Sequence, residues 1–368
     1  MIRLYDIQLF RSYSFLFFGI LVLLLASGCL NSSSKQNGTL REVTDMFGRR
    51  VEIPAQVDSV IGVGPGALRL LVYMDVVDRV SGIEDVELRP GRPYTFAHPE
   101  LGEKPVIGPY MGGDSELIAM NQPDVIFMGF STASDANHLQ RRSGIPVIGL
   151  NSGNLGNARD TLFQAFDLIG EVTGRTARAD SLKNFIRKEI DKLDRLTADV
   201  DAESRPSAYV GAVSYRGAHG ISSTEAFYAP FRFINAINVA GDLKETEPIN
   251  PTGTYVDIEN IIRWDPDYLF IDAAGATQAF PYIQDGEPLA RTLSAIKNDN
   301  VYTLMPHNWY ATNFENVLAN AWFAGTVMYP ALFKGFDPEE KARQIYRFML
   351  GRDVYDEMKS TYDGWNQL

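Results

Sequence analysis

The sequence predicts an α/β fold made of two similar lobes that are joined by one long helix. Three observations predict it. Short apolar runs typical of buried strands alternate along the chain with runs typical of helices. Two segments of 15 residues, 143 positions apart, align without a gap and are identical at six positions. A charged stretch with helical spacing, 175–200, lies between the two copies.

Composition narrows the class of protein. Of 368 residues, 34 are Lys or Arg and 46 are Asp or Glu, which gives a formal net charge of -12. This balance argues against a nucleic-acid partner, because binding a phosphate backbone needs clustered positive charge. Cys29 is the single cysteine, so an intrachain disulfide and a cysteine-ligated metal cluster are excluded.

The N-terminus is typical of an export signal. Two arginines, Arg3 and Arg11, precede the apolar run 14–26, which has the length of a signal sequence and is short for a membrane span. The run leads into Ser27-Gly28-Cys29, which resembles the lipobox of secreted lipoproteins. The resemblance implies cleavage before Cys29 and attachment of lipid to its sulfur. An uncleaved anchor helix is the alternative, and both place the body outside the cytoplasm, anchored to the bilayer.

These signals divide the chain into five segments. We expect a signal peptide over 1–28 and a flexible tether of small polar residues over 29–40. An N-terminal α/β lobe over 41–158, a helical region over 159–204 and a C-terminal α/β lobe over 205–368 follow.

Apolar runs bounded by Pro or Gly predict the individual strands. Those of the first lobe are 57–63, 79–83, 105–107, 124–128 and 146–150, and those of the second are 208–213, 268–271 and 301–304. Helices are expected over about 65–74, 158–168, 313–328 and 338–350. The last begins with Asp337 as cap and Pro338 in its first turn, the usual start of a helix.

The internal repeat aligns residues 114–128 with 257–271 without a gap. In each copy an Asp caps a short helix, a Pro ends it, and a second Asp opens a buried strand. Two such copies predict two related lobes. The shared positions are Asp114/Asp257, Glu116/Glu259, Ile118/Ile261, Pro123/Pro266, Asp124/Asp267 and Phe127/Phe270.

The stretch 175–200 predicts a helix of about 39 Å at 1.5 Å per residue. Its apolar positions recur at helical spacing, and charged residues fill the other face. We expect a stiff connection that permits only small movements between the lobes. The apolar positions are Leu182, Phe185, Ile186, Ile190, Leu193 and Leu196.

Three segments of the first lobe, 43–54, 60–73 and 78–84, resemble the opening hairpin and first strands of periplasmic binding proteins for iron-siderophore, haem and cobalamin ABC importers. The repeat and the long helix fit the same family, so the likeness covers 41–350. It implies the class III periplasmic binding protein fold, with a metal chelate bound between the lobes. It also implies a monomer without catalytic residues, resident metal or cofactor that delivers its ligand to a permease and its ATPase.

The loops that follow strands are rich in aromatic and polar side chains. Ligands of open sheets bind beyond the carboxyl ends of strands, and aromatic walls with Arg or hydroxyl groups suit planar chelates. The predicted ligand-binding residues are Arg69, Tyr94, Tyr110, Tyr215, Arg216, His219, Tyr255, Asn308, Trp309 and Tyr310. The resemblance further implies one permease-docking acid on each lobe, for which Glu84, Glu100 and Glu225 are candidates.

Two alternatives stay open at this point. The run Gly62–Ala67 fits G-x-G-x-x-A after a strand, and Glu84 lies about twenty residues on, which is typical of dinucleotide binding and would suit an exported oxidoreductase. Pro65 weakens this interpretation, because it removes one backbone N–H. The same loop would also suit an anionic ligand edge, with Arg69 one turn away.

The second alternative is capture of a bare metal ion such as Zn²⁺ or Mn²⁺. It requires three histidines, His98, His219 and His307, to meet with Asp114 or Asp257. The fourth, His138, is expected to be an exposed residue of a polar helix.

Overall fold

The computed structural model describes residues 39–243 and 254–368. The predicted signal peptide and Cys29 lie outside the described residues. Residues Arg41–Leu368 form one compact unit. In the described ranges, no helix has the length and apolar character that crossing a membrane requires.

The first lobe contains a sheet of four parallel strands in the order β4-β3-β5-β6. The strands β3, β5 and β6 are buried throughout, as continuous apolar runs predict for a parallel sheet. Their bounds are β3 (Val60–Val63), β4 (Val80–Gly82), β5 (Val125–Met128) and β6 (Val147–Gly149). The predicted strand 105–107 is only a single bridge between Val106 and Ile83. The opening hairpin is present as β1 (Leu40–Thr44) and β2 (Arg50–Pro54).

Four α-helices belong to this lobe: α2 (Ala67–Tyr73), α3 (Pro93–Ala97), α4 (Ser115–Asn121) and α5 (Ala133–Ser143). Helix α5 starts with a reciprocal capping box between Thr132 and Asp135. It ends at Gly144, whose φ of 71° is the left-handed conformation common after a helix. The sequence therefore fixes both ends of α5 locally.

The second lobe contains a parallel sheet in the order β12-β11-β7-β9. When the four strands of each sheet are numbered by their order along the chain, both sheets have the spatial order 2-1-3-4. This shared topology confirms the prediction of two similar lobes. The bounds are β7 (Ser207–Gly211), β9 (Ile237–Asn238), β11 (Tyr268–Asp272) and β12 (Val301–Leu304). Strand β9 was not predicted, because two residues are too few for a pattern. A small ribbon of β8 (Ser223–Thr224) and β10 (Thr254–Tyr255) lies beside this sheet.

The duplication extends to individual side chains. Asp124 Oδ2 accepts hydrogen bonds from the backbone N–H groups of Asp58 and Ser59, directly before β3. Its counterpart Asp267 accepts from the N–H of Ser207, the first residue of β7. Each Asp thus joins the start of the third strand of its lobe to the start of the first.

The helices that precede these aspartates are related as well. Helix α4 and its counterpart α9 (Ile258–Trp264) both end at a residue in the left-handed conformation, Gln122 with φ 54° and Asp265 with φ 42°. The two copies differ at the start. Asp114 accepts from two backbone N–H groups of α4, whereas the Asp257 side chain makes no capping hydrogen bond.

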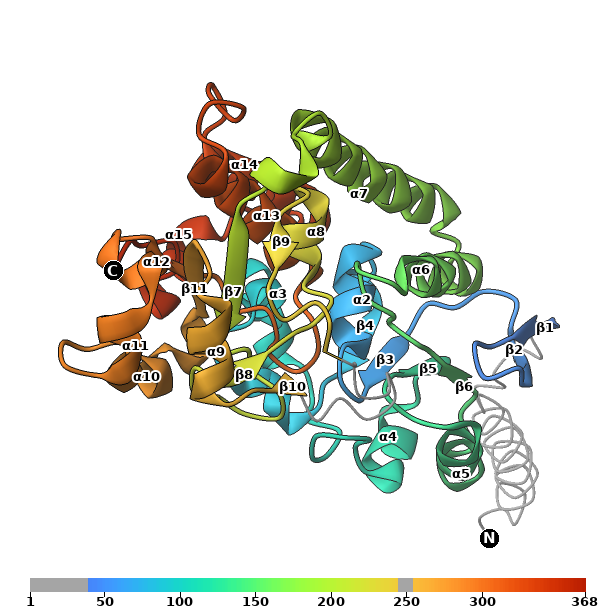
Figure 1. Cartoon of the computed structure of the whole chain (residues 1–368). Helices are drawn as coiled ribbons and strands as arrows, with labels where there is room; N and C mark the ends of the chain where they lie inside the picture. Colours follow the sequence, from blue (N-terminus) through green and yellow to red (C-terminus); the bar gives the residue numbers. More distant parts are fainter. Residues whose placement is uncertain (1–38, 244–253) are drawn as a thin grey trace, which may run out of the picture. The chain divides into compact units, whose positions relative to one another are not determined.

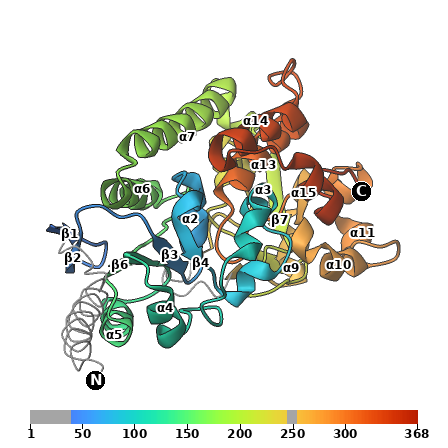
Figure 2. The ribbon, with the colours of Figure 1, turned by 180° about the vertical axis from the view of Figure 1, so that it is seen from behind.

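Between the lobes, α6 (Arg159–Thr173) and α7 (Thr176–Thr197) pack against each other. Helix α7 has 22 residues and spans about 33 Å, one turn less than predicted. Gly174, with φ 72°, ends α6. Figures 1 and 2 show α7 running from α6 toward the helices of the second lobe, and it packs against α8 (Ala229–Phe233) and α13 (Phe314–Met328). The connection is therefore the single long helix that the sequence predicted.

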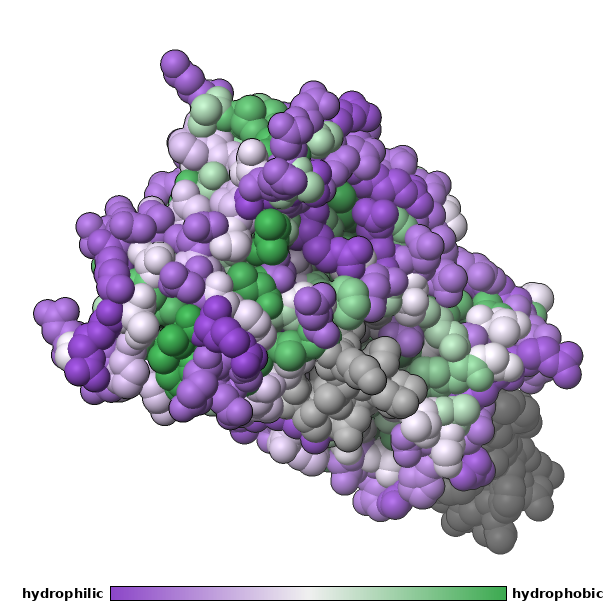
Figure 3. Space-filling view, viewed as in Figure 1, coloured by the Kyte–Doolittle hydropathy of each residue, from purple (hydrophilic) through white to green (hydrophobic). Residues whose placement is uncertain are grey.

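The last helices of the chain pack against helices of both lobes. Asp337 caps α14 (Pro338–Leu350) by accepting from Glu339 N and Glu340 N, as predicted. Trp322 of α13 is fully buried. The remaining helices are α10 (Ala276–Ala279), α11 (Pro288–Thr292), α12 (Ser294–Lys297) and α15 (Tyr355–Tyr362). On the face drawn in Figure 3, the periphery is mostly hydrophilic and hydrophobic residues show in separate patches.

Candidate functional site

A cavity of about 510 Å³ lies at the carboxyl ends of β3 and β5. This is where ligands of open parallel sheets bind. Loops after the strands supply Gly64, Pro65 and 129–131, and a further segment supplies 111–115. Helix α5 forms another side of the cavity, with the lining residues Asp135, His138, Leu139 and Arg142.

Close packing explains the glycines of the loop between β3 and α2. A Cβ atom on Gly64, whose φ is 79°, would lie 2.4 Å from the carbonyl oxygen of Gly129. A Cβ atom on Gly62 would lie 2.8 Å from the backbone nitrogen of Leu68. The two positions therefore require glycine for contact within the protein itself.

The buried side chain of Glu84 fixes the backbone of this loop by hydrogen bonds. It is 1% exposed, and its Oε2 accepts from Gly64 N at 2.9 Å while its Oε1 accepts from Gly112 N at 2.7 Å. Burial raises the pKa of Glu84, although these hydrogen bonds and one from Tyr310 act in the opposite direction. The prediction of Glu84 as a docking acid is therefore wrong, because the carboxylate is inside the protein.

Arg69 and Tyr94 also differ from their predicted role as ligand contacts. Arg69 is 1% exposed, and its guanidinium donates to the carbonyl oxygens of Trp309 and Tyr310, at 2.6 and 3.1 Å. Tyr94 is fully buried and donates to Glu87 Oε2 at 2.7 Å. Neither side chain reaches a surface that a ligand could touch, because each satisfies an interior polar group.

Trp309 and Tyr310 extend from the second lobe to the first. The guanidinium of Arg92 lies 4.7 Å from the centre of the Trp309 ring. The Tyr310 hydroxyl donates to Glu84 Oε2 at 2.7 Å and accepts from Met111 N at 3.1 Å. Both aromatics are half-buried, and their contacts connect the lobes at the edge of the cavity.

A second group of predicted residues does come together, at the end of β7. His219 Nε2 lies 2.7 Å from the carbonyl oxygen of Tyr215 and 3.1 Å from the Tyr255 hydroxyl. The rings of His219 and Tyr255 meet edge to face at 5.4 Å. Asn308 reaches the same strand end by donating to the carbonyl oxygen of Ser214. Tyr255 is 52% exposed, so this group presents an aromatic surface to solvent.

Tyr110 and Arg216 lie at the surface. The Tyr110 side chain is 54% exposed, and its backbone N–H is held by Asp85 Oδ1 at 3.0 Å. Arg216 is exposed and adopts a left-handed φ of 51° between Tyr215 and His219. Both positions are exposed, and their contact with a ligand stays a prediction.

The other two candidate docking acids differ from each other. Glu100 is 45% exposed and lies 2.9 Å from Nδ1 of His98. Glu225 is 18% exposed and pairs at 3.0 Å with Nε2 of His307, which is buried. Of the three candidates, Glu100 is the one with a surface carboxylate.

The three histidines of the bare-metal alternative do not meet. His98 Nε2 contacts the carbonyl oxygen of Leu350, His219 contacts Tyr215, and His307 pairs with Glu225. Within residues 39–243 and 254–368, no three His, Cys, Asp or Glu side chains are grouped as a metal site. The donor set proposed from the sequence is therefore wrong in its geometry.

Sequence reasoning missed part of the cavity wall. Phe130, which is 41% exposed, and Ser131 follow β5 directly, so the rule about strand ends would have found them. His138 and Arg142 lie on α5, and no local pattern in the sequence connects them with Gly64 or Gly112. Their place in the wall comes from the packing of α5 against the sheet.

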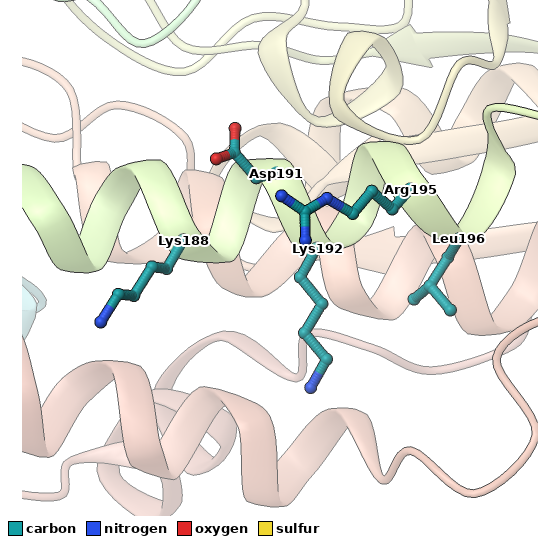
Figure 4. A pocket seen from close by; sticks show the side chains of 5 residues that line it. All are labelled: Lys188, Asp191, Lys192, Arg195 and Leu196. Atoms are coloured by element: carbon teal, nitrogen blue, oxygen red, sulfur yellow. The ribbon is translucent and has the colours of Figure 1, made fainter.

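A second hollow of about 390 Å³ lies along α7 (Figure 4). Its five lining residues are Lys188, Asp191, Lys192, Arg195 and Leu196, all from this one helix. In Figure 4, Asp191 points away from the side to which Lys188, Lys192 and Leu196 point. We do not assign a ligand to it, because its polar groups do not converge.

A family model described as periplasmic binding protein matches residues 63–307, more than half of the chain. The chain belongs to the periplasmic binding protein family. The resemblance noted from the sequence is confirmed, and with it the two-lobed fold and the assignment as a substrate-binding component of an ABC transporter.

Three known proteins are similar to this periplasmic binding protein. Molybdate-binding protein MolA of Haemophilus influenzae is 24% identical over 348 residues, which cover 88% of this chain and 95% of that protein. A periplasmic solute binding protein from Veillonella parvula has a TM-score of 0.68 at 18% identity, covering 88% of this chain and 97% of that one. The petrobactin-binding protein YclQ from Bacillus subtilis has a TM-score of 0.59 at 16% identity, covering 80% and 99%.

The family excludes the oxidoreductase alternative, because its members and these neighbours are solute-binding proteins and not enzymes. The structure supplies the physical reason why Gly62–Ala67 resembles a dinucleotide motif. The glycines serve close packing, and Glu84 accepts the N–H of Gly64 that a pyrophosphate would need.

Proposed function

We propose that this periplasmic binding protein captures a metal chelate, namely a ferric siderophore, haem or a corrinoid, in a cleft between its lobes. It acts as a monomer outside the cytoplasm, tethered to the membrane through lipid on Cys29, and delivers the chelate to a permease with its ATPase. Glu100 is the docking acid that we retain for the first lobe.

The observation that carries the proposal is the exposure of aromatic side chains at the strand ends. Phe130 lines the cavity of the first lobe and is 41% exposed, and Tyr110, which precedes the lining residue Met111, is 54% exposed. Tyr255, beside the end of β7, is 52% exposed. Large apolar side chains left accessible at a concave site suit a flat, partly apolar ligand.

A tetrahedral oxyanion is the second candidate ligand. It is supported by the relative from Haemophilus influenzae, which bears the name of a molybdate-binding protein and matches 88% of this chain. The glycine-rich, polar cavity wall is also compatible with a small anion.

A thermal-shift panel tests the ligand class, because binding to the folded state raises its melting temperature. We expect a ferric siderophore, haem or cobalamin to raise the Tm by a few degrees at saturating concentration. A shift produced by molybdate alone would select the oxyanion, and a shift produced by Zn²⁺ alone would contradict both candidates.

The aromatic contacts are tested with the chelate that gives the shift. Tyr110→Ala and Tyr255→Ala should each weaken binding about three- to tenfold, since an aromatic contact contributes about 0.5–1.5 kcal/mol beyond its buried area. Leu332→Ala is the matched control, because Leu332 is 41% exposed and follows α13, away from the strand ends. Equal affinities for the three variants would remove the aromatic surface from the site.

A further inference from the structure

Two basic side chains of α5, Arg142 and His138, face the cavity of the first lobe. They are four residues apart and therefore share one face of the helix. Both line the cavity, and both are exposed. We propose that Arg142, assisted by His138, binds an anionic group of the ligand, which makes the ligand a carboxylate-rimmed chelate or an oxyanion. This inference rests on the proposed function and names the chemistry of its ligand.

The acidic side chains of the cavity are already occupied. Asp114 Oδ1 accepts from Glu116 N at 2.8 Å and from Leu117 N at 3.0 Å. These two hydrogen bonds lower the pKa of Asp114, and the charge of Arg142 nearby adds to the effect. Asp135 Oδ2 likewise accepts from Thr132 N and Thr132 Oγ1 at the start of α5. Both carboxylates of the cavity wall therefore have hydrogen-bond partners at the start of a helix.

The basic side chains are not occupied in this way. Among the residues that the structure describes, Arg142 and His138 have neither an ion pair nor a hydrogen bond through their side chains. A guanidinium presents a planar set of donors that matches a carboxylate or an oxyanion with two parallel hydrogen bonds. In a chain with a net charge of -12, Arg142 places a full positive charge inside a concave surface, beside Asp114 and Asp135, which already have partners.

The opposite wall offers space and a donor for the same group. A Cβ atom on Gly112 would meet nothing within 4 Å, so a ligand can approach the backbone there. Ser131 Oγ is buried at the wall and has no partner within the described ranges, so its hydroxyl can donate. The anionic group would therefore lie between α5 and the loop after β5.

The test compares two neighbouring arginines of α5. Arg142→Gln removes the cavity charge, whereas Arg141→Gln removes an equal charge from an exposed position outside the lining. Affinities for ferric citrate, molybdate and neutral cyanocobalamin are measured by calorimetry at low and high salt. We expect Arg142→Gln to bind an anionic probe about ten- to a hundredfold more weakly than the wild type, and Arg142→Lys to recover part of the loss.

Arg141→Gln should bind like the wild type, and the salt dependence of binding should fall only in Arg142→Gln. Equal anion affinity in Arg142→Gln and Arg141→Gln would overturn the inference while leaving the proposed function intact. Binding of cyanocobalamin alone by the wild type would do the same. If the wild type binds none of the chelates, the proposed function fails, and molybdate binding that depends on Arg142 would still support the anion site.

Discussion

Tyr310 and Glu84 are 226 positions apart in the sequence, and the Tyr310 hydroxyl donates to Glu84 Oε2 at 2.7 Å. The donor belongs to the second lobe and the acceptor to the first. The same carboxylate holds Gly64 and Gly112, both of which line the cavity. One buried side chain thus fixes the cavity wall and connects it with the other lobe.

Removal of this hydroxyl should destabilise the protein. Tyr310→Phe leaves the buried carboxylate with two backbone donors, and we expect the free energy of unfolding to fall by about 1–3 kcal/mol. Urea denaturation measures the change. Tyr110→Phe is the control, because its side chain is 54% exposed, and it should change stability by less than about 0.5 kcal/mol. Similar values for the two variants would show that the lobes do not depend on this bond.

Arg69 should be sensitive even to a conservative change. Arg69→Lys retains the charge but cannot reach both the Trp309 and the Tyr310 carbonyl oxygens, so we expect a loss of about 1.5–3 kcal/mol in unfolding free energy. Arg89→Lys, at an exposed position, should be nearly neutral. Equal stability of these two lysine variants in a denaturation series would contradict the bridging role of Arg69.

The two repeat aspartates should behave alike. Asp124→Ala removes the acceptor of two backbone N–H groups before β3, and Asp267→Ala removes the acceptor of Ser207 N before β7. We expect each to lower the free energy of unfolding by about 1–2 kcal/mol. Asp191→Ala on the exposed side of α7 serves as control. A loss in only one repeat variant would mean that the two lobes use this contact differently.

His307 gives stability a defined pH dependence. Burial lowers the pKa of His307, but the adjacent carboxylates Glu225 and Asp272 outweigh this and leave it raised. A raised histidine pKa contributes stability that is fully present below the unfolded value of about 6.5 and is lost as the pH rises through the folded value. We therefore expect the stability difference between wild type and His307→Gln to shrink from pH 6 to pH 9.

Asp272 acts in a neighbouring pH range. Burial raises its pKa to about 6, so the folded state binds this proton more tightly than the unfolded state does. The contribution of protonated Asp272 to the free energy of unfolding is fully present below about pH 4 and is lost as the pH rises through about 6. Denaturation of the wild type and of His307→Gln at pH 5, 7 and 9 separates the contributions of the two groups. A constant His307→Gln effect across this series would disprove the linkage.

Local pattern was sufficient to predict the main strands of both sheets. The buried strands β3, β5, β7 and β11 are apolar runs, and the repeat of Pro123 and Pro266 places a helix end before β5 and before β11. These signals act over a few residues, so they can be read without knowing the fold. The group of Tyr215, His219 and Tyr255 followed from the same rule, since its core lies just beyond the end of β7.

The sequence by itself determined two duplicated α/β lobes, the long α7 between them, and the family. Only the tertiary structure decided that Arg69 and Glu84 are interior residues and that Arg142 faces the cavity. The physical reason is that a charged side chain can be buried only when its partners are supplied. For Arg69 those partners are carbonyl oxygens 240 and 241 positions away, a distance over which no local pattern carries information.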